Sequence, residues 1–379
     1  MNTLIYSIFI VYVLMSIYNF VIWLIYIKSN NIKSETIQHK FIICIPCHND
    51  FDDLTNLLDD LSRQKYDRSL LQIVVVLDNC NSKFNHPFRD VTFINRTDES
   101  KKDKIYALIF GTDYISKQNE DAYIVYIDCD VRLKDDFFEI LNSNIKGKDY
   151  LVQPKIELFS ETDKLFFRLK HLKYNYHIIN NVGKSRLNIF NNLNGPLICL
   201  HQDVLKKISW SKLIEYNLLP NSDIVFGLVL SLYDIKIYTS NNLSCLVRET
   251  HIKNAELRKY RRWFSGKIGR IQTLFPVLIV KLFKKPTLYS ITTLLELLAP
   301  PTFYLYLVAI IFTIIFYFEL NIIMMIIWIT ILILYLTPLL YYAKKSNINI
   351  IELAYGGFYF FQMRLRIIFK NIINQKKEW

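Results

Sequence analysis

The feature that most constrains this chain is its first apolar run. Residues 2–27 contain no Asp, Glu, Lys, Arg or His. A helix of that length, rising about 1.5 Å per residue, is longer than the roughly 30 Å hydrocarbon core of a bilayer. No basic segment precedes the run and no small-residue cleavage site follows it, which disfavours a signal peptide. We therefore expect a retained transmembrane anchor over residues 1–28.

A second apolar region leads to the same interpretation. It covers 299–343 and is interrupted at 319–321, which predicts two transmembrane helices joined by a short turn. Lysines flank both regions, at Lys28, Lys33, Lys40, Lys281, Lys284, Lys285, Lys344 and Lys345. Because basic flanks stay in the cytoplasm, we expect a multi-pass protein of the cell (inner) membrane with a cytoplasmic catalytic domain.

Two further stretches mix apolar and basic residues, over 266–298 and 344–379. Both patterns are typical of amphipathic helices at a membrane interface. Ordinary amphipathic helices packed on a soluble domain give the same pattern. The sequence leaves open whether parts of either stretch enter the membrane.

Charge and glycine content exclude several classes of protein. Lys+Arg 46 against Asp+Glu 34 gives a net charge of +12, which indicates an anionic partner. The basic residues lie largely beside the apolar regions, so we expect membrane lipid and no nucleic acid. The nine glycines form neither G-x-x-x-x-G-K-[ST] nor G-x-G-x-x-G, which excludes Walker-type ATPases and dehydrogenases with that fingerprint.

The region between the anchors has the pattern of an α/β domain. Short apolar runs predict strands at 41–46, 72–77, 91–94 and 122–127, and helical spacing predicts helices at 51–66 and 103–117. Near-continuous apolar strands are typical of a largely parallel sheet that is buried on both faces. We expect this domain over 38–265.

Acidic residues follow three of the predicted strands, at Asp50, Asp78, Asp128 and Asp130. Ligands of open α/β sheets bind just outside the carboxyl ends of the strands. The D-x-D spacing of Asp128 and Asp130 can turn two carboxylates toward a divalent cation that bridges phosphate oxygens. The simpler alternative is that both are solvated aspartates in a turn. The acidic residues Asp50 and Asp78, which follow two other strands, disfavour this alternative.

The motifs at these strand ends, in this order, resemble those of membrane-bound family 2 glycosyltransferases, which include bacterial polysaccharide and cellulose-synthase-like enzymes. The resemblance covers roughly 40–265 and the flanking helices. It implies an α/β GT-A domain, the Rossmann-like fold of nucleotide-diphospho-sugar transferases, together with transmembrane α-helices.

The donor side of the resemblance rests on four motifs. The segment 45–50 resembles I-P-x-x-N-E with Asp50 replacing Glu, and 76–82 resembles D-N-x-S/T-D. The segment 103–108 resembles G-K-x-G-A-L without either glycine, and 128–130 matches D-x-D. The residues that would then bind the nucleotide-sugar are Pro46, Asp50, Asp78, Lys104 and Asp128. Asp130 and Asp128 would hold Mg²⁺ or Mn²⁺.

The acceptor side rests on three motifs. The segment 193–196 resembles an N-G segment, and 221–223 resembles T-E-D with Ser222 replacing Glu. The segment 259–263 resembles Q-x-x-R-W with Lys259 replacing Gln. The resemblance makes Asp223 the catalytic base and assigns diphosphate and acceptor contacts to Arg261, Arg262, Trp263, Asn194 and Gly195.

Two of these residues also have simpler interpretations. Asp223 precedes an apolar helical run and could serve as its N-cap. Trp263, beside two arginines, could be an aromatic anchor at the membrane interface.

The resemblance implies an inverting, metal-dependent hexosyltransferase. It would move a sugar from a nucleotide-sugar, first of all a UDP-sugar, to a saccharide or lipid-linked acceptor in cell-surface polysaccharide synthesis, beside polysaccharide-assembly proteins. A non-catalytic membrane scaffold with a degenerate GT-A domain is the alternative, favoured by the altered Asp103, Tyr106, Ser222 and Lys259. A transferase of phosphoryl or nucleotidyl groups to lipid is disfavoured, because the chain has neither a Gly-rich phosphate loop nor many spans.

Overall fold

The computed structural model describes residues 2–28, 37–81, 84, 90–98, 100–101, 103–118, 121–159, 165–216, 222–248, 253–299, 302–358 and 362. The chain divides into two compact units. The larger contains 31–161 and 187–297, and the smaller contains 1–30, 162–186 and 298–379.

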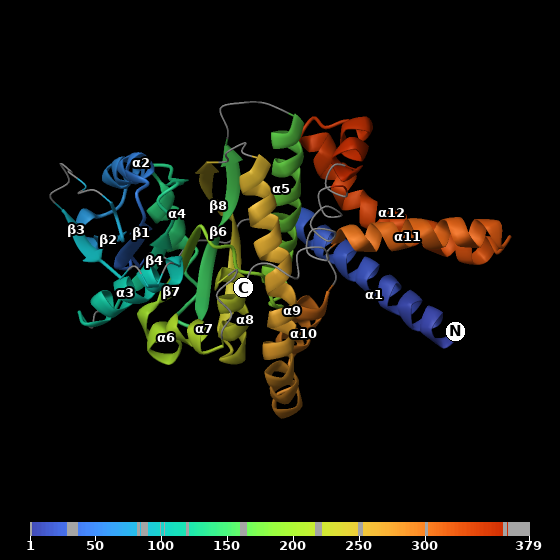
Figure 1. Cartoon of the computed structure of the whole chain (residues 1–379), viewed down its shortest axis with the longest axis horizontal. Coiled ribbons are helices and arrows are strands. Elements are labelled where there is room, and N and C mark those ends of the chain that lie inside the picture. Colours follow the sequence, from blue (N-terminus) through green and yellow to red (C-terminus); the bar gives the residue numbers. More distant parts are fainter. Residues whose placement is uncertain are drawn as a thin grey trace. The chain divides into compact units, whose positions relative to one another are not determined.

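The larger unit is built on one sheet (Figure 1). Within the described residues its strand order is β3-β2-β1-β4-β7-β6-β8-β5. The strands are β1 (Phe41–Cys47), β2 (Leu71–Asp78), β3 (Val91–Arg96), β4 (Tyr123–Ile127), β5 (Val131–Arg132), β6 (Tyr150–Phe159), β7 (Leu197–His201) and β8 (Lys236–Arg248). The four strands expected from the sequence are β1 to β4, each within two residues of its expected ends.

The sheet is mixed, and only its first half is parallel throughout. β1 runs parallel to β2 and to β4, and β2 runs parallel to β3. β7 is antiparallel to both β4 and β6, and β5 is antiparallel to β8. The expected largely parallel sheet therefore holds for β1 to β4. The order 3-2-1-4 places a topological switch point between β1 and β4, where such sheets bind ligands.

Helices cover both faces of the central strands. The helices of this unit are α2 (Phe51–Ser62), η1 (Arg68–Leu70), α3 (Lys104–Ser116), α4 (Phe137–Ser143), α6 (Gln202–Lys207), α7 (Ser211–Glu215), α8 (Ser222–Leu232), α9 (Lys253–Lys284) and α10 (Leu288–Leu298). Cys44 of β1 faces α3, where it approaches Gly111, whereas Phe41 packs against Phe138 of α4, with ring centroids 5.4 Å apart. Because alternate side chains of a strand point to opposite faces, α3 and α4 lie on opposite sides of the sheet.

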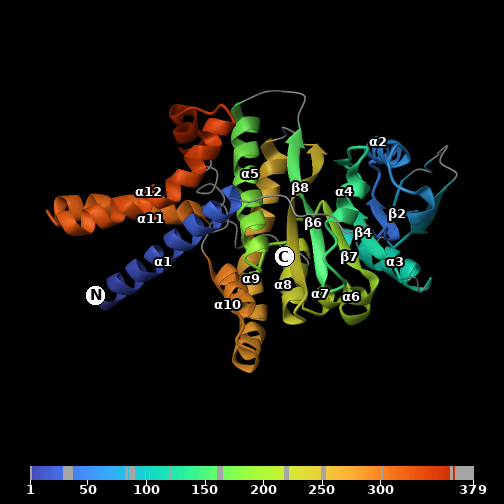
Figure 2. The ribbon, with the colours of Figure 1, turned by 180° about the vertical axis from the view of Figure 1, so that it is seen from behind.

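The smaller unit is helical in its described part. It contains α1 (Asn2–Ile27), α5 (Leu165–Arg186), α11 (Thr302–Phe318) and α12 (Ile322–Lys345). α1 contacts α5 and α12, and α11 lies along α12 (Figure 2). One apolar cluster joins Trp23, Leu172 and Tyr342, and a second joins Tyr12 and Trp328. The helix α5, which the sequence assigns to the α/β domain, thus packs with the apolar helices.

Among the described residues, two helices are long and apolar enough to cross a membrane, judged by length and composition alone: Phe9–Ile27 and Ile322–Lys344. The apolar helix Leu307–Phe318 is shorter. α11 ends and α12 begins on either side of the expected interruption at 319–321, and Asn321 caps α12 by accepting a hydrogen bond from the Met324 N–H, 3.2 Å. Insertion of these helices into a bilayer stays a prediction.

Candidate active site

The loops after β1 and β2 are tied together at the carboxyl end of the sheet. The His48 Nδ1 lies 2.6 Å from the Asp78 carbonyl oxygen, and the Asn81 N–H donates to Asn49 Oδ1 over 2.8 Å. Asn49 and Asn79 have φ values of 62° and 48°. Asparagine adopts this left-handed region more readily than most residues, so both chains can turn sharply where their strands end.

The D-x-D segment forms a tight turn beside these loops. Asp128 follows β4 directly; its N–H donates to the Pro196 carbonyl over 2.9 Å, and its own carbonyl accepts from the Val131 N–H over 3.1 Å. Lys104, the first residue of α3, forms an ion pair with the Asp128 carboxylate. The Lys104 Nζ also lies 3.5 Å from the Gly195 carbonyl oxygen. Three segments far apart in sequence, around 104, 128 and 195, therefore meet at this edge.

Negative charge is concentrated at this edge of the sheet. Burial, together with the charges of Asp128 and Asp53, raises the pKa of Asp130 to about 6, although Lys104 acts to lower it. Burial also raises the pKa of Asp128, against the attraction of Lys104. Desolvation acts to lower the pKa of Lys104, but the charges of Asp128, Asp223 and Asp130 raise it overall. The carboxylates thus repel one another, and the Lys104 ammonium offsets part of this repulsion.

This donor set suits a hard divalent cation. Asp130 forms no ion pair with any side chain in the described part of the chain, whereas Asp128 already pairs with Lys104. Carboxylate oxygens are the ligands that Mg²⁺ and Mn²⁺ prefer. A divalent ion at Asp130 and Asp128 would also relieve the repulsion that raises their pKa values.

Asp223 borders the same edge from α8. It lies in the first turn of that helix, which begins at Ser222, so it is not the N-cap. A Cβ built on Gly195 would lie 2.9 Å from Asp223 Oδ2, so the glycine backbone is packed against this carboxylate. A side chain at position 195 would therefore require the Asp223 carboxylate to shift. Asp223 is thereby placed next to the segment that Lys104 contacts.

A buried glutamine fixes the Asn194–Gly195 segment. Gln153 of β6 is 0% exposed, and its Oε1 accepts from the Asn194 N–H over 2.7 Å. Its Nε2 donates to the Asn192 carbonyl oxygen and to Thr239 Oγ1, each over 2.8 Å. Gln153 was not predicted from the sequence. Its place directly after the apolar Leu151 and Val152 is the signal that could have indicated it, because buried amides need partners.

Asp78, expected to contact the donor base, has an intramolecular partner. Its carboxylate is ion-paired with Arg96, which stands opposite it at the end of β3, and Asp78 Oδ1 also accepts from Asn79 Nδ2 over 3.1 Å. Arg96 is 6% exposed and lies over the Tyr106 ring, 5.4 Å from its centroid. Arg96, too, was missed from the sequence, because only the strand register places it beside Asp78.

The structure also places Pro46, Asp50 and Asp103. Pro46 is buried in β1 opposite Val76, and Asp50 is exposed just before α2. Asp103 N-caps α3 by accepting from the Ile105 N–H over 3.0 Å, which gives its replacement of glycine a structural reason. The side chains of Lys259, Arg261, Arg262 and Trp263, although within α9, lie outside the described residues, as does all of Asn221.

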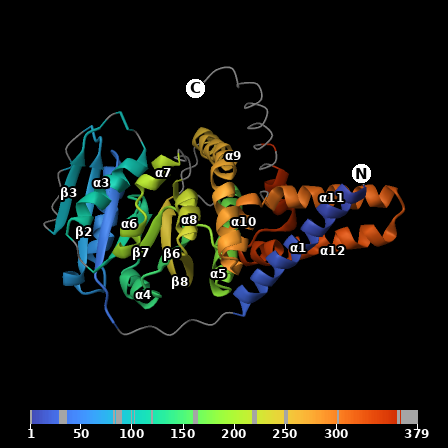
Figure 3. The same ribbon diagram turned by 90° about the horizontal axis from the view of Figure 1, so that it is seen from below.

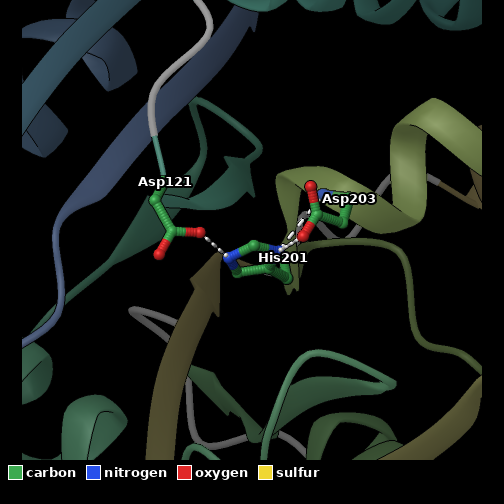
Figure 4. Close-up of side chains that lie close together, drawn as sticks. All are labelled: Asp121, His201 and Asp203. Atoms are coloured by element: carbon green, nitrogen blue, oxygen red, sulfur yellow. Dashed lines mark hydrogen bonds and ion pairs between the residues drawn. The ribbon is translucent and has the colours of Figure 1, made fainter.

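A separate group of possible ligands lies at the opposite edge of the sheet (Figure 4). Asp121, His201 and Asp203 each place one ligand atom within 4.8 Å of the others. Asp121 precedes β4 whereas Asp128 follows it, so a whole strand separates this group from the D-x-D turn. The Lys148 Nζ lies 2.6 Å from Asp121 Oδ1 and 3.4 Å from Asp203 Oδ2. Since the Lys148 ammonium already pairs with both carboxylates, we assign no metal to this group.

A mixed sheet with a parallel β3-β2-β1-β4 half, and a D-x-D turn at its carboxyl edge, has the arrangement of the GT-A fold. The profile described as "Glycosyl transferase family 2" matches residues 42–207. This match agrees with the family that the sequence motifs resemble. No curated protein sequence matches the chain.

One solved structure supports the fold, and two others are reported beside it. The mannosyltransferase PcManGT from Pyrobaculum calidifontis, in complex with GDP-Man and Mn²⁺, is similar with a TM-score of 0.55 at 15% identity, over 98% of this chain and 99% of that one. The structure of S. aureus TarS gives a TM-score of 0.40 at 14% identity, over 62% of this chain and 40% of that one. Its fragment 1-349 in complex with UDP gives 0.40 at 13% identity, over 62% and 66%.

Proposed function

We propose that this protein is an inverting, divalent-metal-dependent glycosyltransferase of the cell membrane. It transfers a hexose from a nucleoside-diphosphate sugar to a saccharide or lipid-linked acceptor in cell-surface glycan synthesis. The observation that carries the proposal is the meeting of Lys104, Asp128 and Asp223 around Gly195, at the switch point of the sheet. The Lys104 ammonium beside carboxylates at that edge suits the binding of a diphosphate leaving group.

The donor would bind with its diphosphate toward Asp128 and Asp130. Mg²⁺ or Mn²⁺ held by these carboxylates would supply Lewis-acid stabilisation of the departing diphosphate. The Lys104 ammonium, which is paired with Asp128, adds fixed positive charge beside the diphosphate. By the family resemblance, Arg261 and Arg262 would contact the same phosphates and Trp263 would stack on the acceptor sugar.

Asp223 would act as the general base. It takes the proton of the acceptor hydroxyl while that oxygen bonds to the anomeric carbon. The bond from the anomeric carbon to the diphosphate oxygen breaks, and its electron pair leaves with the nucleoside diphosphate. A single displacement from the opposite face inverts the anomeric configuration. Gly195 supports this role because its backbone limits where the Asp223 carboxylate can lie.

The proposal is tested by a panel of nucleotide sugars. Full-length protein is incubated with UDP-sugars or GDP-mannose and MnCl₂ or MgCl₂, and the released UDP or GDP is measured. We expect turnover of one donor class and its loss in EDTA. Turnover of no donor with either metal would instead favour the non-catalytic scaffold.

Two substitutions test the roles within the site. We expect Asp130→Asn to abolish metal-dependent nucleotide binding, and Asp223→Asn to abolish transfer while leaving nucleotide binding intact. Binding is measured by calorimetry and transfer by nucleotide release. Transfer by Asp223→Asn at the wild-type rate would show that another group is the base.

A further inference from the structure

Arg270 of α9 is a buried cation that the mechanism above does not use. Its side chain is 6% exposed, and its Nη1 is buried with no hydrogen-bond partner among the described residues. A buried, unsatisfied N–H group of a charged side chain is costly. A guanidinium in this condition is therefore a strong candidate for binding an anionic ligand.

The helices α8 and α9 pack against each other (Figure 3). The charge of Asp223 on α8 acts on Arg270 of α9, which indicates that the two side chains lie near each other. The Lys281 Nζ donates to the Ser231 carbonyl oxygen near the end of α8 and pairs with Asp234 Oδ1 over 2.7 Å. Arg270 precedes Lys281 by 11 residues, and Asp223 precedes Ser231 by eight. At about 1.5 Å per residue these steps cover roughly 16 Å and 12 Å. Leu274 and Leu278, buried in the same core as α8, keep this face of α9 against that helix.

Arg270 and Lys104 both lie within reach of the Asp223 charge. Asp223 packs against Gly195, whose carbonyl oxygen lies 3.5 Å from Lys104 Nζ. Burial lowers the pKa of Arg270, and the Asp223 carboxylate counters this effect. Nearby, burial also lowers the pKa of Lys267, so the same turn of α9 carries a second desolvated cation.

We propose that Arg270 binds a phosphate group carried by the acceptor, and so that the acceptor is anionic. This inference rests on the proposed function, because it takes Asp223 as the group that faces the acceptor hydroxyl. A guanidinium binds phosphate through two parallel N–H donors, which would satisfy the orphaned Nη1. The phosphate can belong to a lipid carrier or to a phosphorylated sugar, since both present the same group.

The test uses inorganic phosphate as the probe. Full-length protein in detergent is saturated with MnCl₂ and UDP or GDP, so that the diphosphate site is filled, and phosphate binding is measured by calorimetry. We expect Arg270→Gln to raise the phosphate Kd at least tenfold while the nucleotide Kd stays unchanged. The matched control is Lys284→Gln, an exposed cation of the same helix, which should bind phosphate like the wild type.

Other results would overturn the inference. Equal phosphate binding by Arg270→Gln and wild type, or no phosphate binding by the wild type, contradicts it. A raised nucleotide Kd in Arg270→Gln would instead assign Arg270 to the donor. If no nucleotide binds with metal but phosphate binding still depends on Arg270, the proposed function fails and the anion site stands. Binding of decyl phosphate and of glucose 6-phosphate then identifies the source of the phosphate group. Tighter binding of decyl phosphate than of inorganic phosphate indicates a lipid carrier. Tighter binding of glucose 6-phosphate than of inorganic phosphate indicates a phosphorylated sugar.

Discussion

Gly195 limits the position of Asp223, the proposed base. A Cβ there would lie 2.9 Å from Asp223 Oδ2 and 3.2 Å from both Asp223 Cβ and Cγ. We expect Gly195→Ala to displace the carboxylate and to lower kcat by roughly tenfold to a hundredfold, because reacting groups tolerate little misplacement. Nucleotide release measures the effect.

The control for this substitution is Gly357→Ala, where an added Cβ meets nothing within 4 Å. It should leave both turnover and Tm unchanged. A Gly195→Ala enzyme with wild-type kcat would mean that the position of Asp223 does not limit the reaction.

His201 makes stability depend on pH at the edge away from the active site. It is 2% exposed, and burial, with the nearby Lys148 charge, lowers its pKa below 6.5 despite the carboxylates of Asp121 and Asp203. Below about pH 6.5 the unfolded chain therefore binds a proton that the folded chain does not, so acid favours unfolding. The contribution of neutral His201 is present above pH 6.5 and is lost as the pH falls.

We expect Tm to fall less between pH 7.5 and 5.5 in His201→Asn than in the wild type. Asparagine keeps a side-chain acceptor for the Asp203 N–H, which His201 Nδ1 accepts over 3.2 Å, so the cap of α6 is preserved. Thermal unfolding followed by circular dichroism measures both slopes. Identical slopes would exclude His201 as the titrating group.

At the scale of elements, α3 places Lys104 beside Asp128 and is held by close packing on the sheet. A Cβ on Gly111 of α3 would lie 2.6 Å from Cys44 Sγ and 2.9 Å from Val76 Cγ2, both in buried strands. We expect Gly111→Ala to lower the free energy of unfolding by about 1–3 kcal/mol through overpacking. This loss exceeds the stability that the higher helix propensity of alanine adds.

Denaturant unfolding measures this loss, and nucleotide affinity reports whether Lys104 moves with the helix. The double variant Gly111→Ala, Val76→Ala should recover part of the stability, because it removes one of the two contacts. A stabilised Gly111→Ala protein would show that α3 moves away from β1 and β2 without cost.

At the scale of the whole molecule, the apolar helices predict that the protein partitions into membranes. Phe9–Ile27 and Ile322–Lys344 have mean hydropathies of 2.1 and 2.5 over spans long enough for a bilayer. We expect the full-length protein to sediment with membranes, to resist extraction by 1 M NaCl and alkaline carbonate, and to dissolve in detergent. Release by salt alone would indicate that only the basic surface holds it there.

Much of the larger unit could be predicted from local sequence. β1 to β4 were found because strands buried on both faces are continuously apolar, and the D-x-D turn because acids rarely follow several such strands by chance. The later strands were not predicted, since β6 and β8 alternate in burial and their pairing depends on register. The grouping of α5 with α1 and α12 was missed for a similar reason, because its sequence lies inside the α/β segment.

The sequence by itself determined the apolar helices, the parallel half of the sheet and the order of the glycosyltransferase motifs, because each depends on residues close together in the chain. Only the tertiary structure decided that Asp78 is paired with Arg96, that Gln153 holds the Asn194–Gly195 backbone, and that Arg270 Nη1 is buried near Asp223 with no hydrogen-bond partner among the described residues. These pairs of residues are 18, 41 and 47 positions apart in the sequence. Strand register and helix packing set such distances, and neither is written in local periodicity.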